Sequence, residues 1–128
     1  GIPIFAAVYS RKRLPSMRDE ILKYLFDIKE AALAIFQFVH GKKFEDYERD
    51  ELLRSGVERK SEIIGEALNS IKNEDAALLD KIRDYRNIVS FRNILAHGYD
   101  TIDDRIVWGI IEEDLGNLLE DIERLSRQ

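Results

Sequence analysis

An arginine, an asparagine, a histidine and a tyrosine stand close together in the last third of the chain. They are Arg92, Asn93, His97 and Tyr99. A guanidinium stays charged at every physiological pH and binds anions. An imidazole, with an ordinary pKa of about 6.5, exchanges protons near neutrality. The four residue types could together bind an anionic group and move a proton at it.

Arg92 stands where the helical periodicity calls for an apolar residue, between Val89 and Ala96. An unpaired charge in a dry core costs several kcal/mol, so this part of the stripe is expected to line a cleft or a wet subunit interface. The alternative is an arginine that reaches the surface along its aliphatic stem. Position alone leaves both interpretations open.

His97 follows Arg92 by five residues, which places the two about 140° apart around an ideal helix. They therefore do not stack on one face, whereas Asn93 and His97 are neighbours one turn apart. His97 also suits the last turn of a helix before Gly98, where the helix dipole favours a cation. Asn93 could orient His97 or be an ordinary polar helix residue.

The elements that must position these residues are predicted to be helices, because their apolar residues recur with helical periodicity. From Ile21 to Val39 apolar residues recur at alternating steps of four and three, and His40-Gly41 follows as a glycine C-cap. Comparable patterns predict helices over 17–40, 45–53, 54–72, 80–98 and 104–126, the last with a capping-box-like start at Thr101 and Asp104. The predicted fold is all-α, an antiparallel four- to five-helix up-and-down bundle.

The composition limits which kinds of functional site the chain can hold. The chain has 128 residues, no cysteine, two histidines and a net charge of −5. We expect no metal site and no cofactor, and no apolar run approaches the ~20 residues that span a bilayer. The acidic balance argues against a general nucleic-acid scaffold, so any RNA contact should be local. We divide the chain into an N-terminal extension, 1–16, and a helical domain, 17–128, and expect a cytoplasmic protein.

The segment 92–99, Arg-Asn-Ile-Leu-Ala-His-Gly-Tyr, resembles the RN-x-x-AH-x-Y signature of HepT-like proteins in the HEPN superfamily. The segment 59–67 is similar to the R-x-x-E-I-I-G-E-A stretch of an earlier helix in that family. Residues 107–108, 114–115 and 118–119 resemble its last helix. The resemblance covers roughly 17–125, nearly everything except the extension.

The resemblance implies the toxin of a toxin–antitoxin pair, a metal-independent endoribonuclease that acts as a homodimer. It places Arg92 and His97 in a composite site at the dimer interface, with Asn93 beside them. It also implies a partner antitoxin, an MntA-like minimal nucleotidyltransferase, that transfers AMP to Tyr99. On position alone, Tyr99 could instead be a core or interface residue that closes the helix.

Three charged residues on the earlier helix could support the site. Arg59, Glu62 and Glu66 could form an ion-pair network against Arg92, or a solvated charged face. A different function also stays open, because related helical domains bind and regulate a nucleotidyltransferase without cutting RNA. A purely structural helical dimer is a third interpretation, which Arg92 in the apolar stripe makes less attractive.

Overall fold

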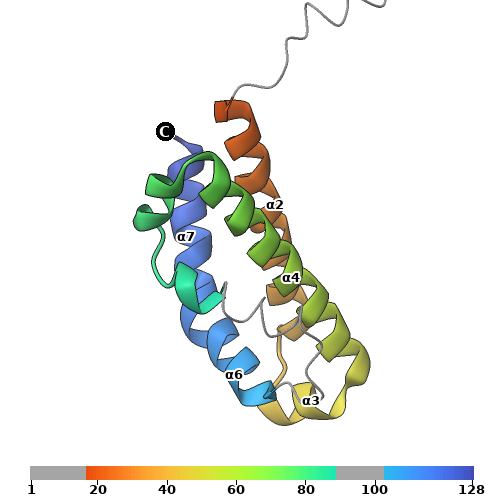
Figure 1. Ribbon diagram of the computed structural model, residues 1–128. Coiled ribbons are helices and arrows are strands. Elements are labelled where there is room, and N and C mark those ends of the chain that lie inside the picture. Colours follow the sequence, from red (N-terminus) through yellow and green to blue (C-terminus); the bar gives the residue numbers. More distant parts are fainter. Residues whose placement is uncertain (1–16, 89–102) are drawn as a thin grey trace, which may run out of the picture.

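The computed structural model describes residues 17–88 and 103–128, and every regular element in these ranges is helical (Figure 1). In chain order they are α2 (Met17–Val39), α3 (Phe44–Arg49), α4 (Glu51–Glu74), the 3₁₀ helix η1 (Ala76–Lys81), α6 (Asp104–Gly109), the π-helical turn η2 (Ile110–Asp114) and α7 (Leu115–Ser126). The all-α prediction is confirmed for this part of the chain. The extension 1–16 and the motif 92–99 lie outside the described residues.

Helix α2 packs against both α4 and α7 and runs antiparallel to them (Figure 1). Its predicted apolar stripe is buried, and the same holds for the inner faces of its neighbours. The buried side chains are Ile21, Leu25, Ile28, Ala32 and Ile35 of α2, Val57, Ile64, Leu68 and Ile71 of α4, and Leu115, Leu118, Ile122 and Leu125 of α7. Each buried Leu or Ile contributes about 1.5–3 kcal/mol to stability, so this seam holds the bundle together.

The end of α2 follows the predicted glycine cap. The helix stops at Val39, and Gly41 adopts a φ of 73°, the left-handed conformation that glycine accepts without a Cβ penalty. The backbone N–H of Lys42 donates to the carbonyl of Val39 at 2.8 Å. The helix predicted over 17–40 is confirmed with its end at the expected place.

The boundary predicted between 45–53 and 54–72 is wrong. The chain breaks at Asp50, so the short helix ends at Arg49 and α4 begins at Glu51. The Asp50 carboxylate accepts a hydrogen bond from the backbone N–H of Leu53 at 3.0 Å. An aspartate at the N-cap satisfies a donor that the first turn leaves open, and this local bond sets the boundary.

The start of the helix predicted over 80–98 is also corrected. Ala76–Lys81 form the 3₁₀ helix η1, and Asp84 adopts a φ of 59° before residues 85–88 become helical. Leu79 and Ile82 are buried from this irregular segment. The apolar spacing therefore predicts correctly which residues are buried here. It does not predict the backbone conformation, which is a 3₁₀ helix followed by a tight turn. Residues 89–98 lie outside the described part.

The last predicted helix, over 104–126, is confirmed as the run of α6, η2 and α7. Its N-cap is Asp103, whose carboxylate accepts from the backbone N–H of Arg105 at 2.9 Å. Asp104 is thus the first residue of α6 and not the fourth position of a capping box, and Thr101 lies outside the described residues. Ile111 and Leu115 are both buried across the π-helical turn, which keeps the apolar face toward the core.

Candidate functional site

The four motif residues, Arg92, Asn93, His97 and Tyr99, lie outside the described residues, but the chain on either side fixes two anchors. Ile88 is buried in the core, and Asp103 caps α6. Arg92 follows Ile88 by four residues, and Tyr99 precedes Asp103 by four residues. Four residues span at most about 14 Å. Chain length therefore limits only how far Arg92 can lie from Ile88 and Tyr99 from Asp103.

The charged face of α4 brings two of the three predicted supporting residues together. The Arg59 guanidinium contacts the Glu62 carboxylate at 3.2 Å. The Arg59 side chain is 64% exposed, so this pair contributes little to stability. Glu66 lies one turn farther along and is exposed. A network with Arg92 stays a prediction, because Arg92 is not among the described residues.

A titratable cluster that the sequence did not single out lies where α3, α4 and α6 meet. The Tyr47 hydroxyl is buried and has no hydrogen-bond partner among the described residues. Burial, followed by the nearby Glu58 and Asp104 carboxylates, raises the pKa of Tyr47, and Arg54 acts in the opposite direction. Tyr47 is therefore a neutral phenol in the folded chain.

Glu58 is the most perturbed carboxylate on α4. Burial raises its pKa, Asp104 and Glu62 add to the rise, and Arg54 opposes it. Functional positions often show perturbed pKa values, because titratable groups there are buried close to groups of the same charge. The signal in the sequence was the spacing: Glu58 precedes Glu62 by four residues, on the same face as the predicted Glu62 and Glu66.

Aromatic rings complete this end of the bundle. The Trp108 ring lies 5.4 Å from that of Tyr47 and 6.4 Å from that of Phe44, between centroids. The guanidinium of the exposed Arg105 lies over the Phe44 ring at 4.5 Å. These contacts tie α6 to α3.

A buried carboxylate, that of Asp121, binds Arg83, which lies five residues before Ile88. Asp121 of α7 is fully buried, and its oxygens accept hydrogen bonds from the backbone N–H of Arg83 at 2.9 Å, from the Arg83 guanidinium and from Arg124 at 3.0 Å. Burial would raise the pKa of Asp121, but these donors outweigh burial and lower it. The spacing of Asp121, three residues after Leu118 and four before Leu125, places it beside the buried face of α7, but its partner Arg83 comes from a distant segment and is not identified by the sequence. The buried carboxylate holds the turn that leads into residues 85–88.

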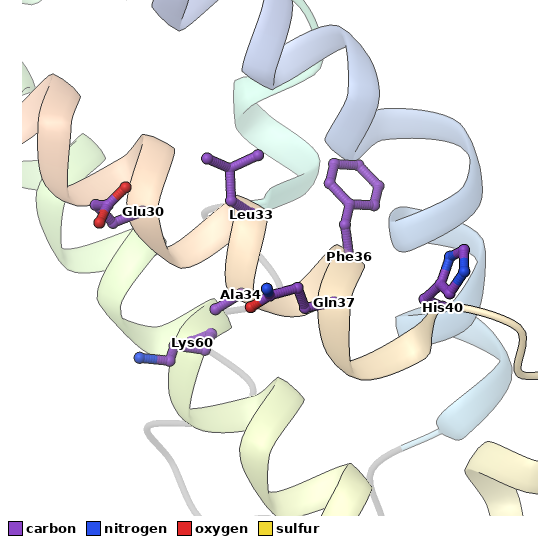
Figure 2. Close-up of a pocket in the computed structure, with 7 residues that line it drawn as sticks. All are labelled: Glu30, Leu33, Ala34, Phe36, Gln37, His40 and Lys60. Carbon is purple, nitrogen blue, oxygen red and sulfur yellow. The ribbon is translucent and has the colours of Figure 1, made fainter.

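His40, the second histidine, lies on the surface in the turn that follows α2. It lines a shallow hollow of about 830 Å³ with Glu30, Leu33, Phe36 and Lys60, among others (Figure 2). His40 is exposed, and within the described residues no group of three or more His, Cys, Asp or Glu side chains is placed to hold a metal ion. In the ranges 17–88 and 103–128, no helix is long and apolar enough to cross a membrane.

Comparison with known proteins gives a single family. The family model described as HepT-like, "Ribonuclease HepT-like", matches residues 28–125. A protein of Thermococcus cleftensis named "Probable ribonuclease HepT" is 36% identical over 81% of this chain and 94% of its own length.

Two further relatives carry related names. A Methanocaldococcus jannaschii protein named as a candidate RNase is 32% identical over 84% of this chain and 97% of its own length. A Caldanaerobacter subterraneus protein, also named as a candidate RNase, is 28% identical over 82% of this chain and 93% of its own. No solved structure gives a significant match.

Proposed function

Because the chain belongs to the HepT-like ribonuclease family, we propose that it is a metal-independent endoribonuclease and the toxin of a toxin–antitoxin pair. The observation that carries this proposal is the family match over residues 28–125, which includes the whole segment 92–99. Relatives named as ribonucleases are similar over nearly their full lengths, which supports the same activity in this chain.

The proposed reaction uses the RNA's own 2′-hydroxyl as the nucleophile. A base removes the 2′ proton, the oxygen attacks the adjacent phosphorus, and the 5′-oxygen leaves with a proton from an acid. The products are a 2′,3′-cyclic phosphate and a 5′-hydroxyl. His97 supplies the proton transfer, and the guanidinium of Arg92 stabilises the extra negative charge of the phosphorane. Asn93 orients His97. No step needs a metal ion.

A symmetric homodimer completes this site. Acid and base catalysis together call for two proton-transfer groups, and the chain's other histidine, His40, lies at the end of α2, on the surface. A two-fold axis beside the motif brings in the partner's His97 and the partner's Arg92. On one ideal helix, Arg92 and His97 point about 140° apart. In a dimer the arginine and the histidine of one site can come from different subunits, so this separation is no obstacle.

Tyr99 is the proposed point of control. AMP attached to its hydroxyl by an MntA-like minimal nucleotidyltransferase antitoxin adds a bulky anion two residues after His97. That anion fills the cleft and repels the phosphate of the substrate. The competing function is a non-catalytic partner that binds or regulates the nucleotidyltransferase, and it predicts no intrinsic cleavage.

The purified chain tests these proposals with a short RNA in the presence of excess EDTA. We expect cleavage to persist at the same rate with and without the chelator. Incubation with the nucleotidyltransferase and ATP should stop cleavage by the wild type but not by Tyr99→Phe, which has no hydroxyl to modify. Cleavage that disappears with EDTA would contradict metal independence, and silencing of Tyr99→Phe would contradict the role of Tyr99.

A further inference from the structure

Two large apolar side chains remain exposed on helix α2, apart from the buried seam. Phe26 is 59% exposed and Leu33 is 38% exposed. They stand seven residues apart, which is two helical turns, so they lie on one face of the helix. Apolar surface of this kind on a soluble protein often marks a place where another segment packs. Within the described residues, both side chains stay in contact with solvent.

The surface of α2 around Leu33 is concave. The hollow of about 830 Å³ follows the second half of the helix, and its lining is mostly apolar where Leu33 and Phe36 contribute. Figure 2 shows these two side chains projecting from the same side of α2, with Glu30 toward the start of the helix and His40 beyond its end. Glu30 and His40 are ten residues apart, about 15 Å along a helix. About five residues of extended chain cover that length.

The N-terminal extension contains an apolar segment of suitable length. Residues 2–9, Ile-Pro-Ile-Phe-Ala-Ala-Val-Tyr, carry no charged side chain, and they lie outside the described residues. The extension joins α2 at Met17, so the segment is tethered to the helix that carries the hollow. A tethered segment has a high effective concentration at nearby surfaces, so its docking does not cost the freedom that a separate chain loses. Contact between the two buries apolar surface of both.

The length of the tether permits this contact. Leu33 lies 16 residues after Met17, which is about 24 Å along the helix. Val8 lies nine residues before Met17, which gives it a reach of about 30 Å in an extended chain. The difference of about 6 Å leaves room for a reversal of direction at Pro15-Ser16, residue types that are common in turns.

The charges agree with the same register. Arg11 follows Val8 by three residues, about 10 Å of extended chain, which brings it to the level of Phe26 and Glu30. Glu30 is exposed at the rim of the hollow and has no ion pair among the described residues. Lys60 also lines the hollow, where the segment is uncharged and brings no like charge. An arginine beside Glu30 therefore adds an attraction at the end where the tether enters.

We propose that residues 5–9 fold back along α2 of their own chain and fill the hollow, with Val8 beside Leu33 and Arg11 between Phe26 and Glu30. The segment acts as a strap that covers the exposed apolar face of the helix. This contact does not depend on the proposed cleavage reaction, and its tests measure the contact and not the cleavage of RNA.

An engineered disulfide tests the strap and its register, because the chain has no cysteine of its own. Val8→Cys with Leu33→Cys should form a disulfide within one chain under mild oxidation. The matched control is Val8→Cys with Asn69→Cys. Asn69 is exposed on α4, next to Ser70, whose side chain lies beside that of Tyr24. The control position is therefore nearer the start of α2 than Leu33 is, and a freely moving extension reaches it at least as easily.

The Leu33 pair should cross-link at least about ten times faster than the Asn69 pair, because only a docked segment holds the two Cα atoms within about 7 Å. Equal rates for the two pairs would overturn the proposal, since they would mean that the extension moves freely. A disulfide that forms between two chains would also overturn it, because the segment would then lie on a second copy.

Release of the strap gives an independent test in the full chain. Phe5→Glu with Val8→Glu places two charges in the apolar contact, which should free the segment and uncover Phe26 and Leu33. The fluorescence of the dye ANS, which binds exposed apolar surface, should then at least about double, with unchanged helical content by circular dichroism. A segment that is already exposed in the wild type would bind the dye itself, and the two glutamates would lower the signal. A fall in fluorescence, or no change, would contradict the proposal.

Discussion

At the scale of single residues, Asp121 shows how a buried charge can stabilise a small helical protein. Its carboxylate accepts hydrogen bonds from the backbone of Arg83 and from two guanidinium groups. These donors replace the water that Asp121 loses on burial. A buried carboxylate without such partners would cost several kcal/mol, so the three residues act as one unit.

Asp121→Asn should lower the free energy of unfolding by about 1–3 kcal/mol, because hydrogen bonds to a charged group are lost. The Arg83 and Arg124 side chains are 52% and 47% exposed, so water solvates them in the variant and limits the loss. Urea denaturation measures it. Glu120→Gln is the control, since Glu120 also contacts Arg83 but is 73% exposed and should change stability by a few tenths of a kcal/mol at most.

The pH dependence gives a second check on Asp121. Its pKa is lower in the folded chain than in the unfolded chain. Stabilisation by the carboxylate is therefore complete above the ordinary aspartate pKa and is lost as the pH falls through the lowered value. The difference between wild type and Asp121→Asn should shrink in that acidic window. A difference that stays constant down to that window would contradict the assigned role of the charge.

Glu58 should behave in the opposite way, because its pKa is raised in the folded chain. Between the ordinary glutamate pKa and the raised value, the folded chain holds more protons than the unfolded chain, so its stability falls as the pH rises. Glu58→Gln should consequently raise the melting temperature near neutral pH and lose that advantage below the ordinary glutamate pKa. The exposed Glu48→Gln is the control. A lower melting temperature for Glu58→Gln near neutrality would show that the charge is needed for folding.

At the scale of elements, the turn between η1 and residues 85–88 is the least regular part of the described chain. Asp84 holds a φ of 59°, which costs most residues about 1–2 kcal/mol and costs Asn and Asp less. Its carboxylate also lies near that of Asp114, whose pKa is raised by burial and then by Asp84. The turn connects Arg83, which binds Asp121, to the helical residues 85–88.

Asp84→Asn should increase the thermal stability near neutral pH, because asparagine tolerates the left-handed conformation and removes the repulsion of Asp114. Asp84→Ala removes the same charge but disfavours that conformation, and should cost about 1 kcal/mol relative to Asp84→Asn. Thermal unfolding of the two variants separates backbone strain from charge. Equal stabilities of the Asn and Ala variants would mean that the backbone conformation carries no strain.

The elements also show what periodicity can and cannot predict. The stripes of α2 and α7 identified their buried faces, because long amphipathic helices are dominated by burial of one side. The break at Asp50 was missed because it depends on one side-chain bond to Leu53, a choice among several polar residues in that stretch. Asp84 and η1 were missed because apolar spacing reports which residues are buried, not which backbone conformation buries them.

The same contrast applies to the candidate site. The pair of Arg59 and Glu62 follows from their spacing on one helix, and it is present. Tyr47 and Asp104 come from different helices, so their proximity to Glu58 depends on how α3 and α6 pack on α4 and could not be seen in the sequence. Arg92, Asn93, His97 and Tyr99 keep the roles that the family resemblance implies as predictions.

At the scale of the whole molecule, the chain belongs to the HepT-like ribonucleases. In the described part of the chain, helix α2 packs on both α4 and α7 through one buried apolar seam. We propose that a two-fold axis beside the motif pairs His97 with the partner's His97.

The central claim is that His97 performs the proton transfer in RNA cleavage. The most direct test is the rate at which a short RNA is converted to a 2′,3′-cyclic phosphate by the wild type, His97→Ala and His40→Ala. These variants remove the two histidines of the chain one at a time. We predict that His97→Ala lowers the rate at least about 100-fold while His40→Ala retains it. Cleavage by His97→Ala at the wild-type rate would contradict the account.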